Sequence, residues 1–209
     1  KCPTGCLTPA RIEDLLSAAR REPAISDSDE TRCRRCGHAR RSAPLTCDLP
    51  LLRGFAPVFQ SDAQVLILGS LPGARSLAQQ QYYGHPRNQF WRLVGGVIGQ
   101  DLSALAYTER PTRLMDHRIA LWDVVASGQR QGSLDVALRI TEHADLAALL
   151  DHLPQLQAIA FNGALAAAQA RLPAAGAALL SLPSSSPANT MPLAAKQQAW
   201  AALHPYLAP

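Results

Sequence analysis

Three short runs of consecutive apolar residues divide the chain from residue 64 onward and predict buried strands, and a fourth run, interrupted by Ser181, is a further candidate strand. They span residues 65–68, 119–122, 158–161 and 179–182. An apolar run without alternation is typical of a strand in a parallel sheet, because helices cover both faces of such a sheet. The first run ends in Gly69-Ser70, which marks the end of the predicted strand.

Apolar residues recur with helical spacing between these runs. Helices are predicted over residues 90–98, 145–153, 164–171 and 193–203. Strands that alternate with helices predict a fold of the α/β class, a three-layer α/β/α sandwich around a central, mainly parallel sheet of about four strands. In such a sheet the binding site forms beyond the carboxyl ends of the strands.

Polar and glycine-rich segments follow all four predicted strands. They comprise residues 69–73, Asp123, Asn162-Gly163 and residues 183–189. Glycine and proline in the first segment permit close approach of the backbone to a ligand, so Gly69, Ser70, Pro72 and Gly73 are candidate binding residues. Asp123 is open to two interpretations of equal weight. It either accepts a hydrogen bond from a base N–H or orients Asn162, or it caps a following turn.

A second dense group of polar and aromatic residues lies just downstream, at residues 81–91. Tyr82, Tyr83 and Phe90 offer flat surfaces for a base, and Arg87 suits a phosphate. The amide oxygen of Asn88 can orient a water molecule. The alternative is an ordinary loop in which Asn88 caps a helix and Phe90 and Trp91 belong to the core. The density of the group favours a site, although Trp91 by itself is expected in the core, and His85 is expected to make structural hydrogen bonds.

These residues resemble a known family. Residues 66–73, 81–83, 85–88 and 90–91 resemble the first signature of the hypoxanthine-DNA glycosylases, a branch of the uracil-DNA glycosylase superfamily. Residues 121–125, 161–163 and 182–189 resemble its later blocks, in the same order. The resemblance extends roughly from Gly54 to the end of the chain.

The resemblance implies roles for individual residues. Asn88 corresponds to the asparagine that supports attack by water, Asn162 to the asparagine at a strand end, and Phe90 with the tyrosine pair to the surface that stacks on a flipped base. Residues 184–189 correspond to the loop that enters DNA. The implied DNA-binding residues of the catalytic domain are Arg87, Ser184, Ser185, Ser186, Pro187 and Asn189.

Two departures from sister families matter for the mechanism. Residues 184–189 contain no histidine, and Ser70 stands where some sister families have a water-activating acid. Both departures assign more of the catalysis to Asn88. The resemblance therefore implies a monofunctional DNA repair glycosylase that flips out hypoxanthine or uracil and hydrolyses the glycosidic bond with water. The alternative function is a non-catalytic DNA- or lesion-binding module with a zinc annex, and the intact block around Asn88 favours the enzyme.

The first fifty residues differ in composition from the rest, which suggests an annex over residues 1–50 and a glycosylase-like domain over residues 51–209. All five cysteines lie in residues 2–47, and Arg34 and Arg35 belong to a group of five arginines between residues 32 and 41. This group suits either phosphate contacts or a solvated loop. The net charge of +4 alone indicates no particular partner.

Two cysteine pairs predict one metal site in the annex. Residues 33–37 have the C-x-x-C-G shape of a metal knuckle, and Cys2 and Cys6 offer a second pair, so that Cys2, Cys6, Cys33 and Cys36 would bind one structural zinc. A [4Fe-4S] cluster and five free thiols are the alternatives, and Cys47 is left over. Segregated cysteines and the absence of an apolar run of about 18 residues predict an intracellular protein without a membrane span. Damaged DNA is the expected partner, and the protein is expected to act as a monomer.

Overall fold

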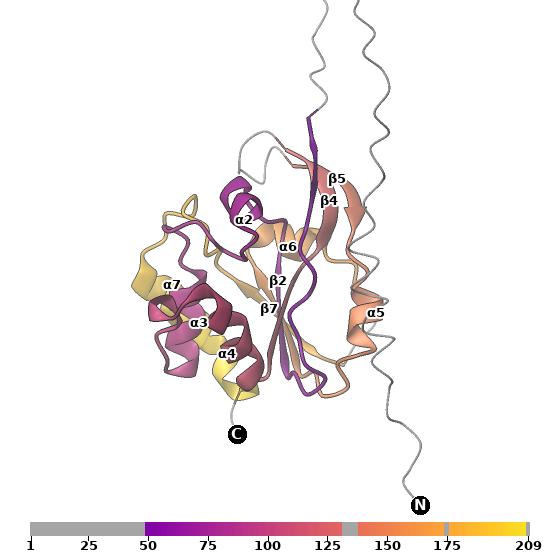
Figure 1. Ribbon diagram of the computed structural model, residues 1–209. Coiled ribbons are helices and arrows are strands. Elements are labelled where there is room, and N and C mark those ends of the chain that lie inside the picture. The colour runs from indigo at the N-terminus through magenta and orange to yellow at the C-terminus, as the bar shows by residue number, and fades with distance from the viewer. Residues whose placement is uncertain (1–48, 131–137, 174–175, 208–209) are drawn as a thin grey trace, which may run out of the picture. The chain divides into compact units, whose positions relative to one another are not determined.

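The central sheet has four parallel strands in the order β3-β2-β6-β7 (Figure 1). The computed structural model describes residues 49–130, 138–173 and 176–207. The strands are β2 (Val65–Gly69), β3 (Ile119–Asp123), β6 (Ala158–Asn162) and β7 (Ala178–Leu182). The predicted parallel sheet of about four strands is therefore confirmed, and each predicted strand lies within one residue of its observed bounds.

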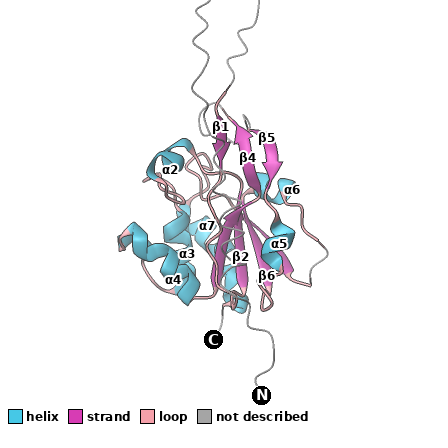
Figure 2. Ribbon diagram, turned by 45° about the vertical axis from the view of Figure 1, so that its right-hand side comes forward, coloured by secondary structure: helices cyan, strands magenta, loops and turns pink. Residues whose placement is uncertain are grey.

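Alternate residues of the central strand β2 enter two separate hydrophobic cores. Val65 and Ile67 pack in one core, and Leu66 and Leu68 pack in the other. All five residues of β2 are buried, because helices cover both faces of the sheet (Figure 2). The three layers that the alternation of strands and helices predicts are present.

The helices divide between the two faces. Side chains from α3 (Phe90–Ile98), α4 (Arg110–Asp116) and α7 (Leu193–Trp200) fill the core that contains Val65. Side chains from α5 (Leu146–Leu150) and α6 (Ala164–Gln169) fill the other core. The bounds predicted for α3 agree with the structure, whereas α5 and α6 are shorter than predicted.

The helix predicted over residues 193–203 ends earlier as an α-helix. After α7 the chain continues as a 3-10 helix over Ala201–Tyr206, which contains Pro205. Proline has no backbone N–H with which to extend an α-helical ladder, so the tighter turn takes over. Two further 3-10 turns, Leu102–Ala104 and Tyr107–Glu109, connect α3 to α4.

Three strands that the sequence pattern did not predict form a second, antiparallel sheet. They are β1 (Leu51–Arg53), β4 (Val125–Gln129) and β5 (Arg139–His143), in the order β1-β4-β5. The chain passes from β3 into β4 within two residues, where the N–H groups of Val124 and Val125 donate to the carbonyl oxygens of Gly69 and Ser70. The short helix α2 (Ala74–Gln79) was not predicted either.

Several expectations lie outside the described residues. They concern the annex over residues 1–50, with its predicted metal ligands Cys2, Cys6, Cys33 and Cys36 and with Arg34 and Arg35. Among the residues that the structure does describe, no helix is long and apolar enough to cross a membrane.

Candidate active site

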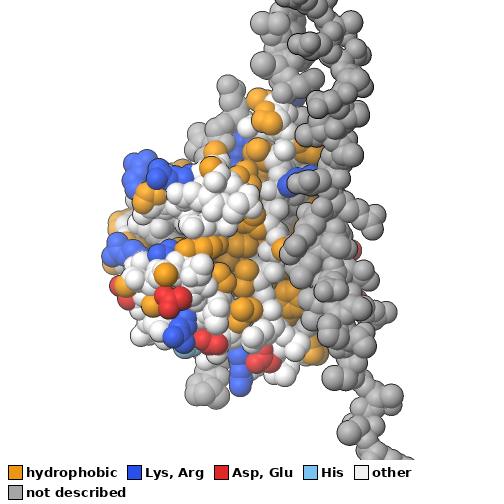
Figure 3. Space-filling model, in the orientation of Figure 1, with side chains coloured by type: hydrophobic (Ala, Val, Ile, Leu, Met, Phe, Trp, Pro, Cys, Tyr) orange, Lys and Arg blue, Asp and Glu red, His pale blue; other side chains and the backbone are white. Residues whose placement is uncertain are grey.

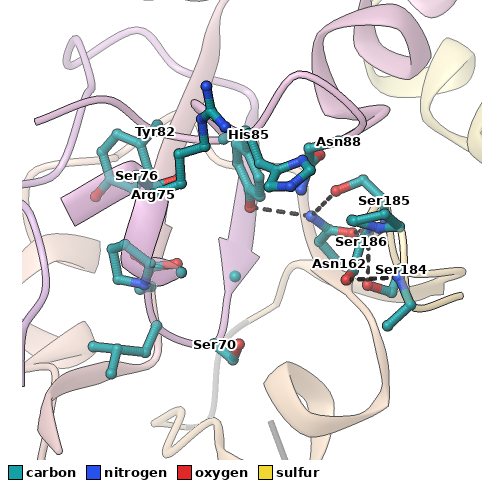
Figure 4. A pocket seen from close by; sticks show the side chains of 18 of the residues that line it. Ser70, Arg75, Ser76, Tyr82, His85, Asn88, Asn162, Ser184, Ser185 and Ser186 are labelled. Atoms are coloured by element: carbon teal, nitrogen blue, oxygen red, sulfur yellow. Dashed lines mark hydrogen bonds between the residues drawn. The ribbon is translucent and has the colours of Figure 1, made fainter. Parts of the chain in front are cut away.

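A cavity of about 500 Å³ opens at the carboxyl ends of the four parallel strands (Figure 4). It brings together the polar segments that follow β2, β3, β6 and β7, as the topology of a parallel sheet requires. The predicted site residues that line it are Gly69, Ser70, Pro72, Gly73, Tyr82, Tyr83, Asn88, Asp123, Asn162, Ser184, Ser185, Ser186, Pro187 and Asn189.

Two predicted site residues do not line this cavity. Arg87 is exposed on the surface close by, and Phe90 has no exposed surface at all. The ring of Tyr83 lies face to face with the ring of Phe90, with 3.9 Å between centroids and 14° between planes. Tyr83 therefore presents the aromatic surface to the cavity, and Phe90 supports it from the core. Trp91 is also in the core, as expected.

Five lining residues were not among the predicted site residues: Leu71, Arg75, Ser76, His85 and Ala188. Arg75 and Ser76 lie on α2, directly after the glycine-rich segment, and Figure 4 labels both among the residues that line the cavity. Nδ1 of His85 accepts a hydrogen bond from the backbone N–H of Arg87 at 3.1 Å. Leu71, His85 and Ala188 lie within the polar segments that the sequence singled out, whereas Arg75 and Ser76 follow the first of these segments.

Gly69 is the last residue of β2 and lines the cavity. It pairs with Asp123 across the sheet. A Cβ atom at Gly69 would lie 2.8 Å from the hydroxyl oxygen of Tyr83 and closer still to a carboxylate oxygen of Asp123. Only glycine leaves room for both side chains at this point.

Asn88 lines the cavity and directly precedes Gln89, the N-cap residue of α3, yet its side chain bonds to the first residue of that helix. Its Oδ1 accepts a hydrogen bond from the backbone N–H of Phe90 at 2.9 Å. Its own N–H donates to the carbonyl oxygen of His85 at 2.8 Å, which closes the turn that carries it. A carbonyl oxygen has two acceptor sites, so Oδ1 keeps one acceptor site beside the cap. The capping and ligand-binding interpretations are therefore compatible.

Asn162 joins three walls of the cavity. Its Oδ1 accepts from the N–H of Ser185 at 2.8 Å, and its Nδ2 donates to the hydroxyl oxygens of Ser185 at 2.9 Å and Tyr83 at 3.0 Å (Figure 4). Both amide hydrogens are thereby used, and the side chain is buried. This bonding fixes Tyr83 and the start of the last loop relative to β6.

A buried carboxyl group lies at the floor of the cavity. Asp123 is 4% exposed. Burial raises the pKa of Tyr82 well above its usual range, and the charge of Asp123 adds to this effect. The Tyr82 phenol therefore stays protonated and donates to the carbonyl oxygen of Ala56 at 3.1 Å.

Two exposed arginines belong to the segments that form the cavity wall. Arg75 and Arg87 are both exposed. The space-filling view shows arginine or lysine side chains on the left-hand side of the molecule, the side on which α3 and α7 lie in Figure 1 (Figure 3). A cavity with a carboxyl group at its floor and exposed arginines beside it suits a ligand that combines N–H donors with phosphates.

Comparisons with known proteins match most of the chain that carries this site. The sequence profile of the uracil DNA glycosylase superfamily matches residues 56–204. A hypoxanthine DNA glycosylase of Methanosarcina barkeri is 41% identical over 150 residues, which are 71% of this chain and 95% of that protein. One of Methanosarcina acetivorans is 41% identical over 152 residues, which are 72% of this chain and 96% of that protein.

A solved structure extends the comparison from sequence to fold. The solution structure of a protein from Methanosarcina acetivorans, assigned as a uracil DNA glycosylase, superposes with a TM-score of 0.66 at 38% identity. The match covers 76% of this chain and 99% of that protein. The profile match, the two relatives and this shared fold show that the chain belongs to the uracil DNA glycosylase superfamily.

Proposed function

We propose that this protein is a monomeric DNA repair glycosylase that flips a deaminated base, hypoxanthine or uracil, out of DNA and hydrolyses its N-glycosidic bond. The proposal rests on the cavity at the carboxyl end of the sheet, which Asn88 and Tyr83 both line. The two relatives named hypoxanthine DNA glycosylases support the choice of a deaminated base.

The cavity suits a flipped nucleotide in size and in surface. Its volume of about 500 Å³ lies within the range of sites that enclose small ligands. A base that leaves the duplex loses its stacking on both sides, and the Tyr83 ring, supported by Phe90, replaces part of that contact. A mispaired base leaves the stack at the lowest cost in free energy, which favours lesions before any contact forms in the cavity.

Asp123 supplies the chemistry that reads a deaminated base. Deamination of adenine or cytosine converts a bare ring nitrogen on the pairing edge into an N–H donor. A carboxylate accepts hydrogen bonds and donates none, so Asp123 at the cavity floor favours the N–H form. A base whose ring nitrogen presents a lone pair to Asp123 is repelled by the carboxylate.

Asn88 supports the attack of water. As the glycosidic bond breaks, positive charge develops on the sugar and negative charge on the departing base. The remaining acceptor site of Asn88 Oδ1 holds a water molecule against the sugar carbon, while the helix cap fixes the direction of the amide. The water adds to the sugar carbon and the bond to the base nitrogen breaks, so the products are an abasic site and the free base.

Contacts to DNA surround the cavity. Arg75 and Arg87 are exposed and contact phosphates, which position the duplex without reading its sequence. Residues 184–189 follow β7 and form the loop that enters the duplex beside the flipped base.

Base release is tested directly with labelled duplexes that contain hypoxanthine, uracil or xanthine, treated with alkali after incubation. We expect an abasic site in an otherwise unbroken strand. Borohydride should trap no covalent adduct, because Lys196 is the one lysine among the described residues and its side chain is fully buried. Binding to lesions without any abasic product would contradict the proposed enzyme and identify a non-catalytic module.

We also propose that Cys2, Cys6, Cys33 and Cys36 bind one structural zinc ion in the annex. The C-x-x-C-G spacing of residues 33–37 supports this proposal. Elemental analysis of the purified protein should give about one zinc per chain and no visible colour. A brown protein with several irons would replace zinc by the iron–sulfur alternative, and a metal-free folded protein with five titratable thiols would exclude both.

A further inference from the structure

Lys196 on α7 is a buried cation whose hydrogen-bond acceptors are neutral. No part of its side chain is exposed. Its Nζ donates to Oε1 of Gln89 and to the carbonyl oxygen of Asn189, both at 2.9 Å. In the described part of the chain no carboxylate forms an ion pair with it. A buried charge without a carboxylate costs free energy, and burial lowers the pKa of Lys196 accordingly.

The choice of residue is also unusual for this chain, which has 18 arginines and only two lysines. An ammonium group is compact and carries three donors on a thin stem, whereas a guanidinium is planar and wider. The ammonium group therefore fits the narrow space between Gln89 and Asn189. Both hydrogen bonds come from a charged donor and are stronger than bonds between neutral groups.

The two acceptors belong to the two parts of the proposed active site that must act together. Gln89 follows Asn88 directly, and its N–H donates to the carbonyl oxygen of Ser185 at 3.0 Å. Asn189 ends the loop that enters DNA. One turn further along α7, Nε1 of Trp200 donates to the carbonyl oxygen of Pro183 at 3.0 Å, so α7 holds the loop at both ends.

We propose that Lys196 is a positioning residue that couples the loop of residues 184–189 to Asn88. The inference rests on the proposed function. When the loop enters the duplex, the ammonium group keeps the loop and the Asn88 turn in register, so that the water held by Asn88 meets the sugar carbon of the flipped nucleotide. Without Lys196 the loop and the turn move independently.

The substitution Lys196→Met tests the coupling, because methionine keeps the length of the side chain and removes its donors. We expect the single-turnover rate on a duplex lesion to fall by about 10-fold, the effect of a modest misplacement of reacting groups. The rate on the same base in a single strand should fall by less than about threefold, since no duplex has to be entered. The matched control is Gln197→Met, whose Nε2 donates to Leu93 on α3 and not to the loop.

A second substitution approaches the coupling from its other end. Gln89→Met removes the acceptor and leaves Lys196 in place. If both residues act through one contact, the double variant should lose no more than either single variant. If the rate losses of Lys196→Met and Gln89→Met add up in the double variant, the proposal is overturned. It is also overturned if Lys196→Met and Gln197→Met lose the same rate on both substrates, because Lys196 would then only support the fold.

Amide hydrogen exchange gives a readout that does not depend on activity. In Lys196→Met the N–H groups of Gln89 and Asn189 should exchange at least about tenfold faster, while that of Leu66 in β2 should not change. Unchanged exchange at Gln89 and Asn189 would overturn the proposal. If the wild-type protein released no deaminated base, the proposed function would fail, and the exchange rates would still decide the role of Lys196.

Discussion

Replacing Asn88 with alanine is expected to lower the single-turnover rate of base release by about 100-fold or more. The amide that orients the water is lost, whereas the aromatic surface of Tyr83 and the phosphate contacts remain. Affinity for lesion DNA should therefore change little. Single-turnover rates at saturating protein and a binding titration on the same duplex measure the two quantities separately.

The hydrogen bond from the N–H of Phe90 to Oδ1 of Asn88, at the start of α3, requires a control. Loss of a hydrogen bond of this kind at a helix N-terminus costs about 1 kcal/mol of stability. Asp101→Ala removes a comparable bond, from the N–H of Ser103 to Oδ1 of Asp101, at a site that does not line the cavity. Asp101→Ala should lose a similar amount of stability and keep its rate. An Asn88→Ala variant that also keeps its rate would leave Asn88 with the role of a cap alone.

Gly69→Ala is expected to lower the rate of base release by about 100-fold through the shape of the cavity. The added Cβ meets the Asp123 carboxylate and the Tyr83 hydroxyl, and both must move. A displacement of about 1 Å in a catalytic site can cost this much in rate, and the overpacking costs about 1–3 kcal/mol in the free energy of unfolding. Rates and melting curves of one preparation give both values.

Gly176→Ala is the matched control for Gly69→Ala. No atom lies within 4 Å of the position that its Cβ would take. This variant should keep both stability and rate. Wild-type rates for both variants would show that Gly69 has no part in shaping the site.

The strands β2, β3 and β6 of the central sheet could be predicted because they are almost entirely buried and therefore consist of apolar runs. β7 could be predicted from its leucines, although alternate residues of it are exposed. The second sheet could not. β4 contains Ser127 and Gly128, and three of the five residues of β5 are exposed, so neither shows a clear pattern. β1, β4 and β5 form through pairing with each other, which tertiary structure determines rather than local propensity.

The candidate site was predictable where it depends on topology alone. Gly69, Asp123 and Asn162 follow strands that must end at one edge of the sheet. Contacts between side chains distant in sequence were not predictable. Lys196 and Gln89 are 107 residues apart, and nothing in a helical pattern indicates that the lysine faces inward. The position of Phe90 behind Tyr83 depends likewise on packing.

The strand order β3-β2-β6-β7 has a consequence for the synthesis of the protein on the ribosome. β2 leaves the ribosome before both of its neighbours, yet it lies inside the sheet with a partner on each side. Until β3 and β6 are complete, the backbone N–H and C=O groups on both edges of this apolar strand have no partner in the sheet. They can then pair with strands of other chains. Pairings between such distant segments form slowly. Folding in the cell should therefore depend on chaperones that shield residues 65–69, and yields in vitro should fall as the protein concentration during refolding rises.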